Sequence, residues 1–213
     1  MESLSENNGI AALYPLDEKV YSVGISTGGV AEMRMAAALP SRRIIATTID
    51  AQGAEFARKK ILESGLSERI EVRIEDVGAP LPYEEGAFDF IYARLVLHYL
   101  PKESLDRSLK ELFRVLKTGG RLYVVVRSVE CQEAQVAGAL YDPETGITRY
   151  VFNGQQLSRY FHSAESIQRH LQAAGFQILH VKSYEELLCS DFERLKPASQ
   201  PDSLIEVLAQ KLS

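Results

Sequence analysis

Residues 19–29 read Lys-Val-Tyr-Ser-Val-Gly-Ile-Ser-Thr-Gly-Gly, a short apolar run that breaks into glycines and small side chains. The pattern predicts a β-strand that ends in a loop, followed by a helix over residues 30–39, which are rich in Ala, Met, Glu and Arg and precede Pro40. Glycines at such a turn let the backbone approach a ligand closely, and the amides of the next helix then point at that ligand. The alternative is a glycine-rich turn that only starts a helix close to the sheet.

The alternation of strand and helix continues beyond this turn. Apolar β-branched runs predict further strands, and amphipathic runs predict helices, in the order strand 44–49, helix 55–64, edge strand 70–74, strand 88–92, turn or short helix 95–100, helix 104–116 and strand 122–126. This cadence is typical of right-handed βαβ units and a parallel sheet.

The pattern changes in residues 128–162, which hold few helix signals. The turn formers at 142–146 predict a hairpin that projects from the sheet. A helix over 164–174 and strands at 176–183 and 204–210 follow, and the irregular stretch between these strands favours antiparallel pairing. We therefore expect a single domain over residues 1–213, with 128–162 as a lid or hairpin insertion.

The composition excludes several classes of protein. The chain has 213 residues, of which 46% are hydrophobic and 25% charged, and a formal net charge of -5, as in an ordinary globular protein. The mild acidity argues against a nucleic-acid partner, and no apolar run is long enough to cross a bilayer. Acidic residues stand where a signal peptide would carry Lys or Arg, and the two cysteines form no metal-binding cluster, so we expect a reduced cytoplasmic protein without a metal site.

Two carboxylates follow predicted strands. Asp50 comes after the second strand, roughly 20 residues beyond the glycine-rich turn, a spacing at which a carboxylate can accept both hydroxyls of a ribose. Asp76 follows the third strand. A carboxylate beside a backbone amide at that point could recognise adenine by accepting a hydrogen bond from its exocyclic amine. Either residue alone would be more typical of a loop cap, but ligands of open α/β sheets bind at this edge.

The stretch from about Lys19 to Arg127 resembles the class I S-adenosylmethionine-dependent methyltransferases, in particular their small methyltransferase-domain branch, type 11. The matching blocks are Ser22-Val23-Gly24-Ile25-Ser26-Thr27-Gly28, Asp50, Glu75-Asp76-Val77, residues 81–91, Leu95-Val96-Leu97-His98-Tyr99-Leu100 and residues 116–122. The resemblance implies a Rossmann-like, doubly wound α/β fold with seven mostly parallel strands, the last one antiparallel. It also implies S-adenosylmethionine as the methyl donor and a small-molecule methyl acceptor.

The same resemblance suggests roles for individual residues. The implied cofactor-binding residues are Gly24, Ser26, Thr27, Gly28, Asp50, Ala51, Asp76, Val77 and Arg94. His98, after the fourth strand, is the candidate general base, since an imidazole titrates near neutral pH. Aromatic and Arg side chains of the predicted hairpin suit an acceptor pocket, which makes the candidate substrate residues Tyr141, Arg149, Tyr150, Arg159 and Tyr160. The alternatives are a packed structural His98 and a hairpin whose aromatics only pack on the domain.

Two positions depart from the family pattern. Ser22 stands where the first strand usually ends in an acid, and Ser26 replaces the usual middle glycine, so weak cofactor binding or a degenerate, non-catalytic nucleotide-binding module is an alternative. A second alternative is an NAD(P)-dependent oxidoreductase. Gly24-x-Ser26-x-x-Gly29 matches the dinucleotide-binding pattern G-x-G-x-x-G except that Ser26 replaces the middle glycine. No Tyr-x-x-x-Lys pair stands out to supply the proton donor of such an enzyme.

Overall fold

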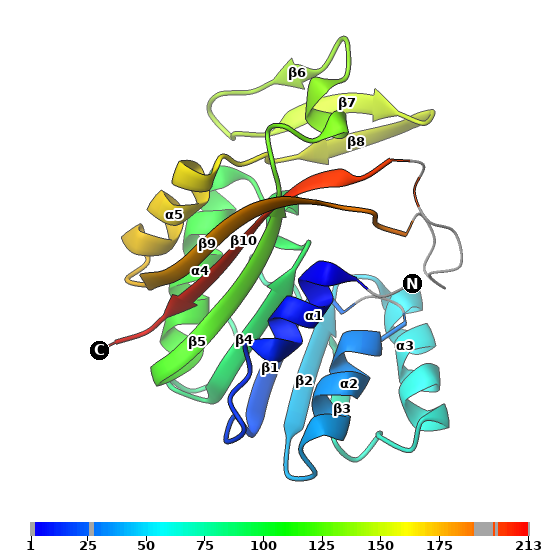
Figure 1. Cartoon of the computed structure of the whole chain (residues 1–213), viewed down its shortest axis with the longest axis vertical. Coiled ribbons are helices and arrows are strands. Elements are labelled where there is room, and N and C mark those ends of the chain that lie inside the picture. Colours follow the sequence, from blue (N-terminus) through cyan, green and yellow to red (C-terminus); the bar gives the residue numbers. More distant parts are fainter. Residues whose placement is uncertain (1–2, 26–27, 190–197, 199, 213) are drawn as a thin grey trace.

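The computed structural model describes residues 3–25, 28–189, 198 and 200–212. Its centre is a seven-stranded sheet in the order β3-β2-β1-β4-β5-β10-β9 (Figure 1). The strands are β1 (Lys19–Val23), β2 (Arg43–Thr48), β3 (Ile70–Ile74), β4 (Phe88–Arg94), β5 (Leu116–Arg127), β9 (Gln177–Glu186) and β10 (Asp202–Gln210). The first five pair in parallel, and β10 runs antiparallel to both β5 and β9. The predicted fold class is confirmed.

Helices cover both faces of this sheet (Figure 1). They are α1 (Leu4–Ala11), α2 (Val30–Ala38), α3 (Ala51–Glu63), α4 (Lys102–Val115) and α5 (Ala164–Ala173), with short 3-10 turns η1 (Leu97–Tyr99) and η2 (Gln132–Gln135). One core joins the sheet to α2 and α3, through residues such as Met35 and Ile61. A second core joins the opposite face to α4 and α5, through residues such as Leu109 and Leu171.

Strand β5 shows why the sequences of the central strands are apolar at nearly every position. Leu122, Val124 and Val126 belong to the core on one face, and Tyr123 and Val125 belong to the core on the other. Successive side chains of a strand point to opposite faces, so a strand covered on both sides has no position for a solvated residue. This burial explains the strength of the sequence pattern in residues 122–126.

Helix α1 is absent from the sequence-based expectation, because its buried residues carry no apolar stripe. Ser5, Glu6 and Gly9 are the buried positions of this helix. A Cβ at Gly9 would lie 2.5 Å from Tyr92 Cε2 and 2.6 Å from Tyr123 Cε1, so only glycine lets the helix rest on the two rings. The helix therefore docks through close backbone approach and polar contacts.

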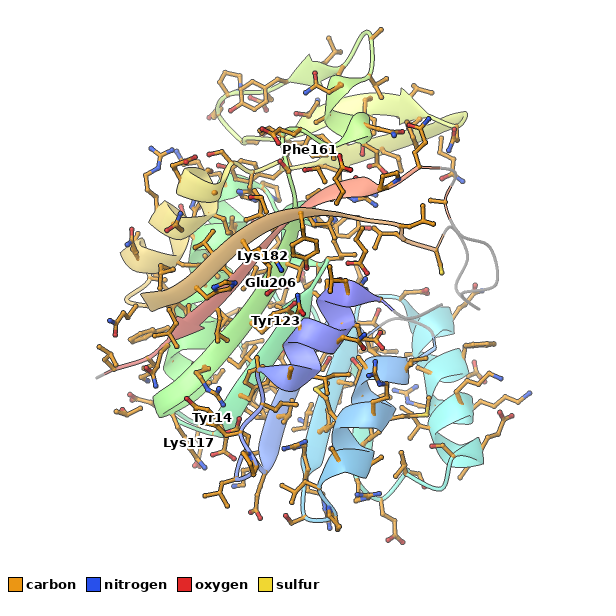
Figure 2. The ribbon with its side chains drawn as sticks, in the orientation of Figure 1. Tyr14, Lys117, Tyr123, Phe161, Lys182 and Glu206 are labelled. Atoms are coloured by element: carbon orange, nitrogen blue, oxygen red, sulfur yellow. The ribbon has the colours of Figure 1, made fainter. Side chains whose placement is uncertain are left out.

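A buried carboxylate fixes α1 to the strands beneath it. Glu206 Oε2 accepts hydrogen bonds from Tyr123 and Tyr184 hydroxyls, each at 2.8 Å, and from Asn8 Nδ2 at 2.9 Å. The Tyr123 hydroxyl also lies 2.6 Å from the Ser5 carbonyl oxygen. Figure 2 shows Tyr123 and Glu206 on neighbouring strands beside α1. The last strand of the chain thus holds its first helix.

The predicted hairpin is part of a three-stranded antiparallel sheet, β6 (Leu140–Tyr141), β7 (Thr148–Phe152) and β8 (Gln155–Arg159). The turn formers at 142–146 join β6 to β7, and a second turn at Asn153 and Gly154, both with positive φ, adds the third strand. This small sheet lies beyond the upper ends of the parallel strands in Figure 1. Tyr160 N donates to His98 O at 2.8 Å, which ties the small sheet to η1.

His162 lies where the small sheet returns to the main domain. Its side chain is fully buried, its ring lies 4.2 Å from that of Tyr160, and neither ring nitrogen has a hydrogen-bond partner within the described residues. Burial, and to a smaller degree the nearby His170, lowers the pKa of His162 to about 3. The folded protein therefore keeps this ring neutral.

This burial makes His162 a source of acid sensitivity. Below a pH of about 6.5 the unfolded chain binds a proton that the folded chain does not, so each pH unit down to about 3 lowers the free energy of unfolding by about 1.4 kcal/mol. For His162→Phe, we expect the loss between pH 7 and pH 5 to be about 2 kcal/mol smaller than for the original protein. Urea unfolding at both pH values measures the difference, and equal losses would contradict it.

Candidate functional site

A cavity of about 540 Å³ opens at the carboxyl edge of the parallel strands. Its wall combines segments that follow β1, β2, β3 and β4 with the ends of β5 and β9. Strand ends converge at this edge because all the parallel strands run in one direction, which makes it the usual ligand site of a doubly wound sheet. Several candidates of the sequence-based expectation line this cavity: Gly24, Asp50, Asp76, Val77, Arg94 and His98.

The turn after β1 needs glycine. Gly24 has a φ of +74°, and a Cβ there would lie 2.6 Å from Val96 Cγ2, so a larger residue would be strained and would collide with the segment after β4. Gly29 caps α2 with a φ of +57°. Gly28 is described but does not line the cavity, while Ser26 and Thr27 lie outside the described residues.

A buried carboxylate supports this turn where the family's acid is missing. Ser22, at the position of that acid, donates through Oγ to Glu32 Oε1 at 2.5 Å. Glu32 comes from α2 and is 2% exposed. The only sign of it in the sequence is an acidic residue inside a helix of small and apolar side chains, which solvent exposure would explain equally well. A carboxylate is therefore present beneath the turn, supplied by a different element.

The carboxylates after β2 and β3 each serve a local turn. Asp50 caps α3 by accepting from Gln52 N at 3.0 Å through Oδ1, and Asp76 Oδ1 accepts from Gly78 N at 2.8 Å. Both side chains are exposed and line the cavity, and in the described part of the chain no hydrogen bond reaches Oδ2 of either one. Each residue can thus cap its turn and still offer one oxygen to a ligand. Ala51 begins α3 and does not line the cavity.

Glu75 is a third acid on the cavity wall that the sequence did not single out. Its two oxygens accept from the hydroxyls of Tyr21 and Tyr83. Burial, reinforced by the hydrogen bond to Glu75, raises the pKa of Tyr21. Because one of its oxygens accepts from Tyr21 of β1, Glu75 braces the end of β3 against β1.

Arg94, at the end of β4, lines the cavity but is engaged by α1. Its Nε donates to Ser5 Oγ at 2.7 Å, one terminal nitrogen donates to Ser3 Oγ at 2.9 Å, and the same nitrogen lies 3.7 Å from Glu186 Oε1. Ser5 N in turn donates to Glu186 Oε2 at 3.1 Å. These contacts close one side of the cavity with the start of the chain, so Arg94 positions α1 as well as facing the ligand space.

His98 lies in η1 and is 1% exposed, although it forms part of the cavity wall. Burial, followed by the positive charges of Arg127 and Arg159, holds the pKa of His98 well below its usual range. Its Nδ1 has no hydrogen-bond partner among the residues that the structure describes. The imidazole is therefore neutral at pH 7 and retains an unused polar atom.

The five candidate substrate residues do not line this cavity. Tyr141 and Arg149 are exposed on β6 and β7. Tyr150 packs on Phe161 and donates to Glu133, Arg159 stacks on the Tyr99 ring at 4.2 Å, and Tyr160 bonds to His170 Nε2 at 3.0 Å. The contacts of Tyr150, Arg159 and Tyr160 agree with packing, the alternative that the sequence left open. The small sheet contacts the cavity wall where Arg159 stacks on Tyr99, and it also contacts Glu133, which pairs with Arg127 of the wall.

Arg127 and Glu186 line the cavity but were not predicted as site residues. Both lie at strand ends, β5 and β9, and their register against β4 depends on pairings between distant parts of the chain. The sequence places Arg127 after its strongest strand, which was the available signal. Within the described residues, no group of three His, Cys, Asp or Glu side chains could hold a metal ion.

The fold and its rim cavity define a Rossmann-like, ligand-binding α/β domain. Residues 22–124 match the family model described as "Methyltransferase domain". The chain is 32% identical over 115 residues to sterol 4-C-methyltransferase strm-1 of Caenorhabditis elegans, a match that covers 54% of this chain and 33% of that protein. It is 35% identical over 123 residues to the ubiquinone/menaquinone biosynthesis C-methyltransferase UbiE of Rhizobium johnstonii, with 54% and 45% covered.

Solved structures agree at the level of the fold. A SAM-dependent methyltransferase from Methanosarcina mazei superposes with a TM-score of 0.69 at 20% identity, covering 94% of this chain and 98% of the other. Residues 22–124 thus match the methyltransferase-domain family, and the resemblance drawn from the motifs is confirmed. The chain spans less than half the length of these two curated relatives. None of the described helices has the length and apolar character needed to cross a membrane.

The Ser22–Glu32 pair can be tested by restoring the acid of the family. Ser22→Asp would place a second carboxylate against buried Glu32, so we expect the free energy of unfolding to fall by about 2–3 kcal/mol. Adding Glu32→Gln removes the repulsion and should recover part of this loss. Chemical denaturation of the two single variants and the double variant measures the coupling. Equal stability of Ser22→Asp and the original chain would show that Glu32 does not occupy the place of the acid.

Proposed function

We propose that the protein transfers a methyl group from S-adenosylmethionine to a small organic acceptor in the cavity at the carboxyl edge of the sheet. The observation that supports this function best is the meeting of the Gly24 turn, Asp50 and Asp76 on one cavity wall. The first offers close backbone approach, and the other two offer acceptors for hydroxyl and amine groups. A nucleoside presents such groups.

The residues present fit the donor. Asp50 would hold the ribose hydroxyls and Asp76 the adenine amine, each through the oxygen that its own turn leaves unused. The Gly24 turn and Val77 would contact the rest of the nucleoside, and Arg94 would face its amino-acid portion. When bound, S-adenosylmethionine supplies a methyl group on a sulfonium, which is already activated for displacement. The protein then has mainly to position the acceptor, an effect that can contribute roughly 7–11 kcal/mol.

His98 is the residue we propose to act on the acceptor. Its neutral ring can accept a proton or a hydrogen bond from an acceptor hydroxyl or amine. Burial places it where water competes poorly for that contact. The insertion over residues 128–162, which contains the small sheet, would act as a cover that sets the position of His98 through Tyr160 N, while its aromatic side chains stay packed.

The names of the two relatives point to the class of acceptor. Both are C-methyltransferases, one acting on a sterol and one in quinone biosynthesis. A small organic acceptor also agrees with an acidic protein, since the net charge of -5 disfavours nucleic acid. We extend the proposal to a protein of the cytoplasm, with a cofactor site that needs no metal.

Ligand titration tests the proposed function. Calorimetry with S-adenosylmethionine, S-adenosylhomocysteine and NAD should show binding of the first two only. Asp50→Asn should weaken S-adenosylmethionine binding by one to two orders of magnitude, because it removes a charge-assisted contact of about 1.5–3 kcal/mol. Asparagine caps helices as well as aspartate does, so α3 keeps its first turn and the loss reports the ligand contact.

Two results would count against this function. NAD binding without S-adenosylmethionine binding would favour the oxidoreductase alternative. No binding of any of the three ligands at millimolar concentration would favour a degenerate module.

The protonation state of His98 can be followed without knowing the acceptor. Because burial and two arginines lower its pKa, we expect the ring to stay neutral as the pH falls from 7 to 5.5. Nitrogen NMR of the histidine rings, assigned with His98→Asn, measures this directly. A His98 ring that gains a proton near pH 6.5 would contradict both the burial and the positive surroundings.

A further inference from the structure

A second cavity, of about 350 Å³, lies between α4 and α5, which pack on the same face of the sheet (Figure 1). Its wall consists of residues of these two helices, Ala174 directly after α5, and Tyr160 directly after β8. Within the described residues it shares no lining residue with the cavity at the carboxyl edge of the sheet. Its volume falls in the range of small-molecule sites. The space can therefore hold an organic molecule outside the proposed donor site.

The wall from α4 follows the repeat of the helix. Lys102, Asp106 and Lys110 stand four residues apart, a spacing that places them on one face. A carboxylate at this spacing is a natural partner for either lysine, but Asp106 Oδ1 lies 2.6 Å from His170 Nδ1 instead. Among the described residues, neither lysine forms an ion pair. Both lysines are exposed and thus bring an uncompensated positive charge to the cavity.

The wall from α5 adds a third cation. Ser166, Arg169, His170 and Ala173 are spaced three or four residues apart along this helix and line the cavity together. In the part of the chain that the structure describes, Arg169 donates only through Nε, to Glu165 O at 3.4 Å, and forms no ion pair. Its terminal nitrogens remain for a ligand, and the short side chain of Ala173 leaves space beside them.

The carboxylate on this wall belongs to a chain of hydrogen bonds. Asp106 holds His170 Nδ1, and His170 Nε2 lies 3.0 Å from the Tyr160 hydroxyl. Tyr160 N also donates to His98 O, which fixes the residue to η1. Because Asp106 is turned to the His170 ring, it does not neutralise the three cations. The cations and the ring network occupy one wall with separate partners.

The charges of the wall select the kind of ligand. Leaving His170 aside, three positive side chains and one carboxylate give the wall a net charge of +2, although the whole chain carries -5. A phosphate monoester has a charge of about -1.5 to -2 at pH 7 and three acceptor oxygens. A carboxylate ligand has one charge and two oxygens, so it matches the three cations less well.

We propose that the cavity between α4 and α5 binds a small organic phosphate monoester, whose phosphate group is held by Lys102, Lys110 and Arg169. The organic part of the ligand fills the space beside Ala173 and Ala174. This binding site goes beyond the proposed methyl transfer and does not depend on it, because the two cavities have different walls.

Calorimetric titration with phenyl phosphate and benzenesulfonate tests the site. The probes have similar shapes, but at about pH 7.5 phenyl phosphate carries close to two negative charges and benzenesulfonate carries one. We expect phenyl phosphate to bind at least about fivefold more tightly, because the wall carries more than one uncompensated charge. Lys110→Gln should weaken phenyl phosphate binding by about three- to tenfold, and the double variant with Arg169→Gln by at least about tenfold.

Lys59→Gln is the matched control. Lys59 is another exposed helical lysine, without an ion pair within the described residues, but it lies in α3 and lines neither cavity. Its replacement changes the net charge of the chain equally and should leave phenyl phosphate binding unchanged. All three side chains are exposed, so the variants should fold, and thermal unfolding checks this.

Amide NMR locates the bound probe. Phenyl phosphate should shift the signals of Lys110, Arg169 and Ala173 more than those of Gly24 and Asp76 at the edge of the sheet. Equal binding of the two probes, equal losses in the Lys110 and Lys59 variants, or shifts centred on Gly24 and Asp76 would each overturn the site. So would the lack of saturable phenyl phosphate binding at millimolar concentration. None of these results requires S-adenosylmethionine, so the proposed function is tested apart from this site.

Discussion

The central strands of this protein are buried on both faces, and that constraint determines where chemistry can occur. Strand β5 gives alternate side chains to two separate cores, and β1 and β4 do the same. A polar group in the middle of such a strand would lose its hydration on either face. Polar groups inside the strands, such as Tyr123 and Glu206, therefore pair with one another, and the polar side chains that can meet a ligand lie at the strand ends, where the loops leave the sheet. The cavity, its carboxylates and Arg127 all lie at that edge.

Local patterns predicted much of this arrangement. The five parallel strands, the two C-terminal strands and helices α2, α4 and α5 follow periodicities that a short window can detect. Asp50 and Asp76 could be chosen as candidates for the same reason, because each follows an apolar strand closely. Helix α1 was not found, since it docks through Gly9, Ser5 and a network around Glu206, and none of these contributes an apolar stripe.

The parts of the site that could not be predicted depend on contacts between distant segments. Glu32 reaches Ser22 from a helix, and Glu186 reaches Arg94 from β9. Arg127 acquires its orientation from Glu133 and Asp202, which the sequence places on unrelated elements. In the small sheet, aromatic and Arg side chains that match the composition of a pocket are engaged in packing instead of lining the cavity. Composition alone does not distinguish these uses, because burial of a ring is favourable in either place.

The amide of residue 160 has a consequence for how this domain could acquire new substrates. One backbone hydrogen bond joins the inserted sheet to the turn that carries His98, and the Tyr160 hydroxyl, on the same residue, reaches His170, which bonds to Asp106 of α4. An exchange of the insertion for another of different length would keep His98, the proposed base, in the same position only if the returning strand presented an N–H at the same point. The return of the insertion at Tyr160 is thus constrained by the position of His98, whereas the exposed turn at Asn153 and Gly154 can accept changes of length.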